Sequence, residues 1–403
     1  MNRREFLARG AMAAASIGFP SLSFASREPE LRLGYLPITD SAPLLVAHGL
    51  GFFKEEGLKV KRPLRVRSWA ALMESFLTGK FNLTHMLLPM PVWMRFKSRV
   101  PVKVLAWNHT NGSAMTVRGG SDLTDFSTLG GSHVAVPHWY SIHNVMLQMA
   151  LRHYGLTPVI QPHEKPLAPN EVNIFVLPPP EMPAALAGRK VDGYIVAEPI
   201  NAISEVKTGA RIMRFTGDMW KNHPCCVVVM PEKTIGAHPA FAQRAMNAIV
   251  RAQLWITQNR EAAAVLLSRD GMGYLPMGKE VLKQAFLAYD PSVYGPSGAI
   301  RNPSWDVSRI GFQPWPYPSA TRLLIGELSR TLVEGNTDFL KGLNADYAAR
   351  ELVDDRFVRR ALEAVGGIET FAFGDLGENP FQREEIISIE GGTGVAKGDG
   401  KGA

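Results

Sequence analysis

The first half of the chain alternates short apolar runs with amphipathic stretches of helical period. LRLGYLP (31–37) has the length and pattern of a strand, whereas SWAALMESFLTGK (68–80) spaces its apolar residues as a helix does and closes at Gly79. Strands are predicted at 31–37, 59–66, 83–91, 102–108, 132–137, 173–179 and 191–199. Helices are predicted at 43–48, 68–80, 91–98, 144–156 and 181–189. This alternation of strand and helix indicates parallel sheets flanked by helices.

Beyond the apolar run CCVVVM (225–230) the pattern becomes helical. Residues 238–269 are predicted to form a long helix, and mixed helix and loop follow to about residue 371. The Gly-rich end, 390–403, is expected to be a disordered tail. We therefore expect an α/β protein of two lobes, each a sheet flanked by helices, with extra C-terminal helices and a cleft between the lobes. The expected lobes are 29–113 with 224–371, and 114–223.

The first 25 residues are predicted to be a signal peptide. They begin with Arg3 and Arg4, continue with an Ala-rich apolar stretch, and end in Ser-Phe-Ala, a small-x-small cleavage site. The motif RREFL resembles the twin-arginine export signal. A retained membrane anchor is the alternative, but the apolar stretch is shorter than the roughly 20 residues that a span needs, and Pro20 interrupts it. We expect an exported periplasmic protein, free of the membrane.

Composition excludes several classes of protein. The formal net charge is +7, and the predicted leader carries +2 of it, which leaves +5 for the mature chain. This modest charge, without a dense Lys/Arg stripe, makes nucleic acid a poor partner and suits an anionic ligand only weakly. Two cysteines cannot form a disulfide framework, so the fold depends on a hydrophobic core, for which 46% apolar residues are ample.

No catalytic motif or metal-ligand spacing stands out in the sequence. The chain lacks a nucleophile elbow, a phosphate loop, an H-E-x-x-H pair and a dinucleotide-binding glycine pattern. We therefore expect neither enzymatic activity nor a cofactor or metal. Cys225 and Cys226 are neighbours, and on a strand their side chains would point to opposite faces, so they are expected to be two small buried hydrophobes.

Three positions are candidates for holding a ligand. Trp69 opens a helix directly after a strand, although a core tryptophan would look the same. His143 falls in the first turn of a helix that Ser141 is expected to cap, where free backbone N–H groups and the helix dipole favour an anion. Lys221, in WKNHP, lies where the chain passes between the lobes, and a cation there could reach a cleft. A capping histidine and a solvated lysine are the alternatives.

Taken together, these segments resemble the nitrate- and bicarbonate-binding proteins of ABC transporters, within the wider nitrate/sulfonate/taurine-binding group. The resemblance runs in family order from about residue 31 to 226, roughly half of the chain. It is carried by LRLGYLPITDSAPLLVAHGLGFFKEEGL, SWAALMESFLTGKFNLTHMLLPMP, SIHN, VLPPPEMPAALAGRKVDGYIVAEPIN and MWKNHP. It implies a monomeric solute receptor of the type II Venus-flytrap form. Such a receptor closes over its ligand and delivers it to a membrane permease driven by a separate ATPase.

The resemblance also implies ligand contacts. Trp69, His143 and Lys221 match the family's motif positions, and a cation, an imidazole and an indole N–H would share the charge of a small oxyanion. Two departures leave the ligand open: Ser113 stands where relatives carry Gln, and Cys225 stands where bicarbonate binders carry a calcium-holding acidic residue. The aromatic loop His138-Trp139-Tyr140 adds ring area for a planar or larger ligand, so Trp139 joins the candidate contacts.

We therefore expect a receptor for a small anion, with nitrate or nitrite first. An organic ligand, such as a sulfonate or a planar heterocycle, is one alternative. A ligand sensor that signals through a protein partner is another. Thiamine-precursor synthases share the implied fold, but they need a Cys-rich iron-binding segment that two cysteines cannot supply.

Overall fold

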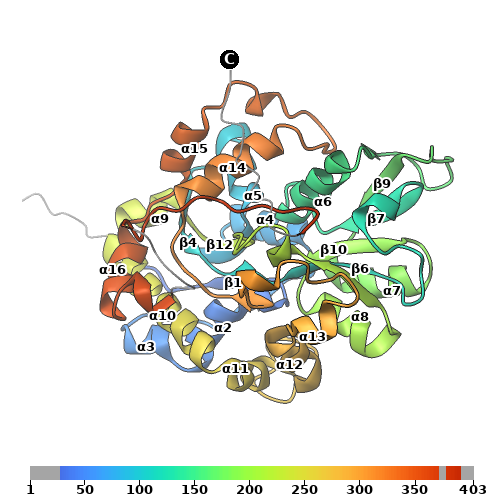
Figure 1. Cartoon of the computed structure of the whole chain (residues 1–403). Coiled ribbons are helices and arrows are strands. Elements are labelled where there is room, and N and C mark those ends of the chain that lie inside the picture. Colours follow the sequence, from blue (N-terminus) through green and yellow to red (C-terminus); the bar gives the residue numbers. More distant parts are fainter. Residues whose placement is uncertain (1–27, 372–377, 392–403) are drawn as a thin grey trace, which may run out of the picture.

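The computed structural model describes residues 28–371 and 378–391 of the chain (Figure 1). The expected signal peptide and almost all of the expected tail lie outside the described residues. The described chain forms two main sheets surrounded by helices, so the expected fold class is confirmed. Among the described residues, no helix is both long and apolar enough to cross a membrane.

The first sheet combines N-terminal strands with one strand that returns from much later in the chain. Its order is β2-β1-β3-β12-β4. The strands are β1 (Leu33–Tyr35), β2 (Leu64–Arg65), β3 (Leu83–Leu87), β4 (Val102–Trp107) and β12 (Cys226–Pro231). β1 pairs in parallel with β2 and β3, as predicted, but β12 runs antiparallel to β3 and β4. The prediction of parallel sheets is wrong for β12, because this strand enters from the second sheet and not through a strand-helix-strand crossover.

The second sheet is built from the middle of the chain, in the order β11-β6-β10-β7-β9-β8. Its strands are β6 (Ser113–Val117), β7 (Ser132–Val136), β8 (Thr157–Val159), β9 (Glu171–Val176), β10 (Gly193–Ala197) and β11 (Arg211–Phe215). β7, β9 and β10 are parallel, whereas β6 is antiparallel to both β10 and β11. The hydrophobic pattern had singled out neither β6 nor β11, and these antiparallel strands lie next to the connections between the sheets.

Helices cover both sheets. Those before β12 are α2 (Ala42–Gly49), α3 (Phe52–Glu55), α4 (Trp69–Leu77), α5 (Pro89–Val92), α6 (Ile142–His153), α7 (Met182–Ala187) and α8 (Ile200–Thr208). Those after it are α9 (Glu232–Ala237), α10 (Pro239–Gln258), α11 (Arg260–Leu267), α12 (Lys279–Leu287), α13 (Pro291–Tyr294), α14 (Pro318–Leu328), α15 (Ala345–Leu352) and α16 (Arg356–Ala364). The single long helix expected at 238–269 is interrupted at Asn259, which separates α10 from α11.

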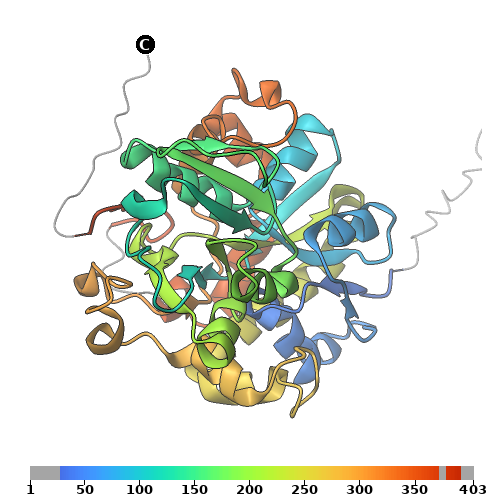
Figure 2. The same ribbon diagram turned by 90° about the vertical axis from the view of Figure 1, so that its right-hand side faces the viewer.

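The C-terminal helices return to the first sheet. α10 packs against α2 and α16, and α16 also contacts β4. In Figures 1 and 2 the elements of the second sheet gather on one side of the molecule, and the blue N-terminal elements lie on the other with the yellow helices α10 and α11. One buried apolar cluster includes side chains from both sheets, so the two halves share a continuous core.

A buried ion network ties the C-terminal part to the second sheet. The Arg309 guanidinium donates to Oε1 of Glu198 at 2.8 Å and to Oε2 of Glu205 at 2.7 Å. The Arg309 and Glu198 side chains have no exposed surface. Attraction to Glu198 and Glu205 outweighs burial and raises the pKa of Arg309, so this residue remains a cation.

Candidate functional site

Two segments of the chain pass between the sheets and run side by side. Residues 107–113 lead from β4 to β6, and residues 215–226 lead from β11 to β12. The Asn108 N–H donates to the carbonyl of Cys226 at 2.8 Å, and the Asn111 N–H donates to the carbonyl of His223 at 2.9 Å. This antiparallel pairing joins the two sheets and holds His109 next to the cysteine pair.

Polar side chains gather around this pairing and are fully or almost fully buried. Three of them come from the crossing segments and the start of β12. The other three come from the turn before α2, the start of β6 and the first turn of α6. We call this group the central cluster: Asp40, His109, Ser113, His143, Cys225 and Cys226. Burying polar groups costs free energy unless each finds a partner, so such a concentration points to a binding site.

In one half of the central cluster, three side chains surround the Oδ2 atom of Asp40. It lies 3.0 Å from Nε2 of His109, 3.1 Å from Sγ of Cys226 and 3.7 Å from Sγ of Cys225. The other carboxylate oxygen, Oδ1, has no hydrogen-bond partner among the residues that the structure describes. The carboxylate therefore has unused capacity to accept a hydrogen bond or bind a cation.

His143 and Ser113 form the other half of the central cluster. The Oγ of Ser113 lies 2.9 Å from Nε2 of His143, and both atoms approach the Cys225 sulfur, at 3.8 and 3.9 Å. His143 holds this position because Ser141 caps α6: the Ser141 Oγ accepts the Asn144 N–H at 3.0 Å. The predicted cap is thus confirmed, and the His143 ring lies beside the free N–H groups of the first helical turn.

Charges within the central cluster shift its titration. Burial alone would lower the pKa of His109, but attraction to the Asp40 carboxylate outweighs it and raises the pKa to about 10. Burial would raise the pKa of Cys225, yet the hydrogen bond from the Cys226 thiol, with His143 and His109 nearby, brings it well below its ordinary value. Burial and the hydrogen bond to Cys225 raise the pKa of Cys226 well above its ordinary value. Burial also raises the pKa of Asp40, although the attraction of His109 opposes this rise.

The prediction for the two cysteines is correct about burial and wrong about direction. Both are fully buried and free, but both sulfurs approach the same oxygen of Asp40 and do not diverge. The reason is local, because β12 begins at Cys226 and Cys225 precedes the regular alternation of the strand.

The two candidate tryptophans lie outside the central cluster. Trp69 is the first residue of α4 and is 2% exposed, with its ring centroid 5.4 Å from that of His85. His85 is buried next to the cluster, and burial lowers its pKa to about 3, so this ring is neutral. Trp139 is partly exposed, and its indole N–H donates to Oε2 of Glu334 at 3.1 Å.

Lys221 is also outside the central cluster. It is partly exposed, and its backbone N–H donates to the carbonyl of Ile386 at 3.0 Å, where residues 378–391 cross the molecule (Figure 1). In the described part of the chain, its ammonium group has neither an ion-pair partner nor a hydrogen-bond acceptor. Lys221 is four residues from Cys225 along the same crossing segment, and within the described residues its ammonium group is available to pair with an anion.

Asp40, His109, Cys225 and Cys226 were not identified from the sequence as residues of a site. They come from three separate segments, so their spacing along the chain does not indicate that they converge. The available signal was composition: PITDSAPLL and LAWNHTNG place polar residues inside apolar surroundings, where a buried polar group is expected to have a partner.

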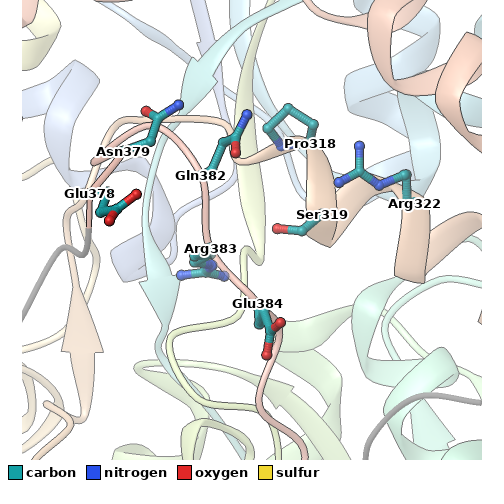
Figure 3. A pocket seen from close by; sticks show the side chains of 8 residues that line it. All are labelled: Pro318, Ser319, Arg322, Glu378, Asn379, Gln382, Arg383 and Glu384. Atoms are coloured by element: carbon teal, nitrogen blue, oxygen red, sulfur yellow. The ribbon is translucent and has the colours of Figure 1, made fainter.

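A separate cavity of about 470 Å³ lies under the C-terminal segment, away from the central cluster (Figure 3). Figure 3 shows the side chains around it, from the start of α14 and from the C-terminal segment: Pro318, Ser319, Arg322, Glu378, Asn379, Gln382, Arg383 and Glu384. Arg383 is occupied within the protein, because it pairs with Glu385 and lies over the rings of Trp107 and Tyr317. None of the candidate ligand residues lines this cavity.

The family model described as the NMT1-like family matches residues 25–268, more than half of the chain. This chain belongs to the NMT1-like family. The matched region contains both sheets and every residue of the central cluster.

Curated relatives of this NMT1-like protein include transport proteins. It is 27% identical over 318 residues to the nitrate/nitrite binding protein NrtA of Nostoc sp., an alignment that covers 66% of this chain and 70% of NrtA. It also matches the nitrate import ATP-binding protein NrtC of Synechocystis sp. at 26% identity, but that alignment covers 64% of this chain and only 40% of NrtC.

Solved structures place the protein among periplasmic binding proteins by fold. The nitrate-binding protein NrtA of Synechocystis aligns with a TM-score of 0.70 at 18% identity, covering 90% of this chain and 94% of NrtA. The aliphatic sulphonate binding protein SsuA of Escherichia coli aligns with a TM-score of 0.57 at 16% identity, covering 81% and 92% of the two chains. At these identities the likeness establishes the fold alone, and the resemblance expected from the sequence is confirmed at the level of family and fold.

Proposed function

We propose that this protein is the exported solute-binding component of an ABC importer. It captures a small ligand between its two sheets and delivers it to a membrane permease driven by a separate ATPase. The observation that carries the proposal is the central cluster, a buried polar site made by side chains from both sheets where the two crossing segments meet. The family and the binding proteins among its relatives support this role, and they agree with a receptor that carries out no reaction.

We propose nitrate or nitrite as the first ligand to test. A small planar oxyanion needs a few directed donors, which the hydroxyl of Ser113, the His143 ring and the N-terminus of α6 offer together. The nitrate-binding relatives support the same choice. Lys221, unpaired within the described chain, would supply a cation as the ligand enters, and Trp69 and Trp139 would line the approach.

The lobes and the location of the protein are part of the proposal. We assign residues 29–113 and 224–371 to one lobe and 114–223 to the other, in line with the membership of the two sheets. Closure would be a hinge motion at the crossing segments 107–113 and 215–226, where few residues separate the sheets. We place the mature protein in the periplasm, as a monomer exported by its twin-arginine-type leader.

An organic ligand is the second candidate. Ser113 is much smaller than the Gln that the family resemblance places there, so a larger ligand group, such as that of a sulfonate or a planar heterocycle, would take the volume of the missing side chain. The fold shared with a sulphonate-binding protein is compatible with this alternative. A ligand sensor would share the site but not the permease, and a permease or ATPase gene beside this one would count against it.

Isothermal titration of the mature protein tests the function. The panel comprises nitrate, nitrite, bicarbonate, taurine, a longer alkanesulfonate and a planar heterocyclic acid, each at constant ionic strength. Saturable heat with nitrate or nitrite is expected. Saturable heat with only a sulfonate or only the heterocycle would contradict nitrate and nitrite as ligands but would still support a solute receptor. No heat with any member of the panel would overturn the anion receptor.

A further inference from the structure

The central cluster contains a complete set of metal ligands. Asp40, His109, Cys225 and Cys226 each offer one donor atom, and these four atoms all lie within 4.8 Å of one another. All four side chains are fully buried. We propose that they form a binding site for a thiophilic divalent cation of the Zn²⁺ class, a role that goes beyond anion capture and does not depend on it.

The distances between donor atoms suit a tetrahedral ion. Bond lengths of about 2.3 Å to sulfur and 2.0–2.1 Å to nitrogen or oxygen put the edges of a tetrahedron at about 3.3–3.8 Å. From Oδ2 of Asp40, the observed separations are 3.0 Å to His109 Nε2, 3.1 Å to Cys226 Sγ and 3.7 Å to Cys225 Sγ. These three separations lie within about half an ångström of the edges of such a tetrahedron.

The unused polar atoms of the cluster are a second observation that indicates a ligand. Oδ1 of Asp40 and Nδ1 of His109 are buried and have no hydrogen-bond partner in the described chain. The backbone nitrogen of Cys226 lies 3.3 Å from Nε2 of His109, a separation too long for a strong hydrogen bond. Burying a carboxylate, two thiols and an imidazole together costs free energy of folding, and a dication bound between them would offset that cost.

The chemistry of the donors selects the kind of ion. Two sulfur donors disfavour Ca²⁺ and Mg²⁺, which take oxygen ligands. Sulfur combined with imidazole and carboxylate in a tetrahedral arrangement is typical of Zn²⁺. To ligate the ion, the Cys226 thiol and the protonated His109 ring each give up one proton to solvent, and the dication takes the place of these two protons between the four donor atoms.

A vicinal disulfide is the competing outcome for the cysteine pair. It would leave Asp40 and His109 without a role, whereas the metal site uses all four side chains. The site also faces Ser113 and His143, since Cys225 lies 3.8 and 3.9 Å from their polar atoms.

The test uses the mature full-length protein, reduced and stripped of metal by a chelator, in buffer free of nitrate and nitrite. Zn²⁺ is titrated by calorimetry with a competing chelator, and Co²⁺ is followed by absorption. We expect one Zn²⁺ per chain, a higher melting temperature with Zn²⁺, and thiolate-to-cobalt charge-transfer bands with the intense visible bands of a tetrahedral site. The spectra need no variant, so they remain informative if a substitution impairs folding.

Variants assign the ligands. Asp40→Asn and Cys226→Ser should each weaken Zn²⁺ binding by a factor on the order of 100 or more, since losing even an outer-shell partner costs 10–100-fold. His163→Gln removes one of two stacked surface histidines, His133 and His163, and should leave the affinity unchanged. The proposal is overturned if the reduced protein binds no Zn²⁺, if binding survives both ligand variants, or if the Co²⁺ spectrum lacks thiolate bands. Because nitrate is absent, these outcomes are independent of whether the anion receptor holds.

Discussion

The sulfur of Cys226 lies 3.1 Å from Oδ2 of Asp40, although 186 positions separate the two residues in the chain. Asp40 belongs to the turn before α2, and Cys226 opens the strand that returns from the second sheet. Their contact forms only because β12 inserts between β3 and β4. His109, Ser113 and His143 lie around these two residues, so the central cluster depends on the pairing of β12 with β3 and β4.

Replacing His143 by Ala should weaken anion binding by about 1–3 kcal/mol, roughly 5- to 150-fold in Kd, because a buried donor is lost. Titration of the variant with the best ligand of the panel measures the change. His153→Ala, at the exposed end of the same helix, is the matched control and should bind like the wild type. Equal affinities of the two variants for the ligand would show that His143 does not contact it.

Lys221→Ala should cost about 2–4 kcal/mol of anion binding, roughly 30- to 700-fold in Kd, if the ammonium pairs with the ligand once desolvated. Lys207→Ala, an exposed lysine on α8, is the control and removes the same charge from elsewhere on the surface. A loss of affinity that is equally small in both variants would show that Lys221 acts only through the overall field of the protein.

Arg309→Ala should lower the free energy of unfolding by about 3–5 kcal/mol, because it leaves the buried Glu198 carboxylate without its cation. Thermal or urea unfolding measures this. Arg322→Ala breaks a surface ion pair with Asp346 and should cost no more than about 1 kcal/mol. Similar losses for both variants would contradict the assignment of the Arg309 network as a stabilising link.

Stability should fall as the pH drops below about 6.5. Burial lowers the pKa of His138 from 6.5 to about 4, so between these values the unfolded chain binds a proton that the folded chain does not. The contribution of His138 to the free energy of unfolding is fully present above pH 6.5. It is lost as the pH falls toward 4, with a slope of at most about 1.4 kcal/mol per pH unit. Urea unfolding of the wild type and of His138→Gln at several pH values checks it. The difference between the two should change across this window, and a constant difference would contradict the shift.

The hydrophobic pattern predicted those elements whose period reflects local burial. β1, β2, β3, β4, β7 and β10 fall within predicted segments, as do α4 and α7, whereas β9 and α6 each begin two residues before theirs. Ser141 was predicted to cap a helix, and its hydroxyl accepts the expected backbone N–H; Ser68, where a helix was predicted to start, does the same. Capping and amphipathic packing depend on residues within a few positions of each other, so the sequence carries them directly.

The candidate site residues also fall into two groups: those predicted from local sequence features and those that only the fold brings together. From the sequence, His143 is predicted as a ligand contact because a helix N-terminus is a local feature, and Trp69 and Lys221 are predicted from the family motifs; all three stay predictions. The sequence did not identify Asp40 or His109 as members of a site, and it predicted that the two cysteines diverge. Their approach to Asp40 depends on where β12 begins, and a single-residue difference in the start of a strand reverses the direction of a side chain.

The sequence by itself determined the fold class, the order of the main strands and helices, the family resemblance and the capped N-terminus of α6. Only the tertiary structure decided that β12 is antiparallel, that the crossing segments 107–113 and 215–226 pair, and that four metal-ligating side chains meet at one buried point. Periodicity and caps are properties of neighbouring residues, whereas the central cluster depends on which distant strands pair, and that pairing is settled by burying one shared core.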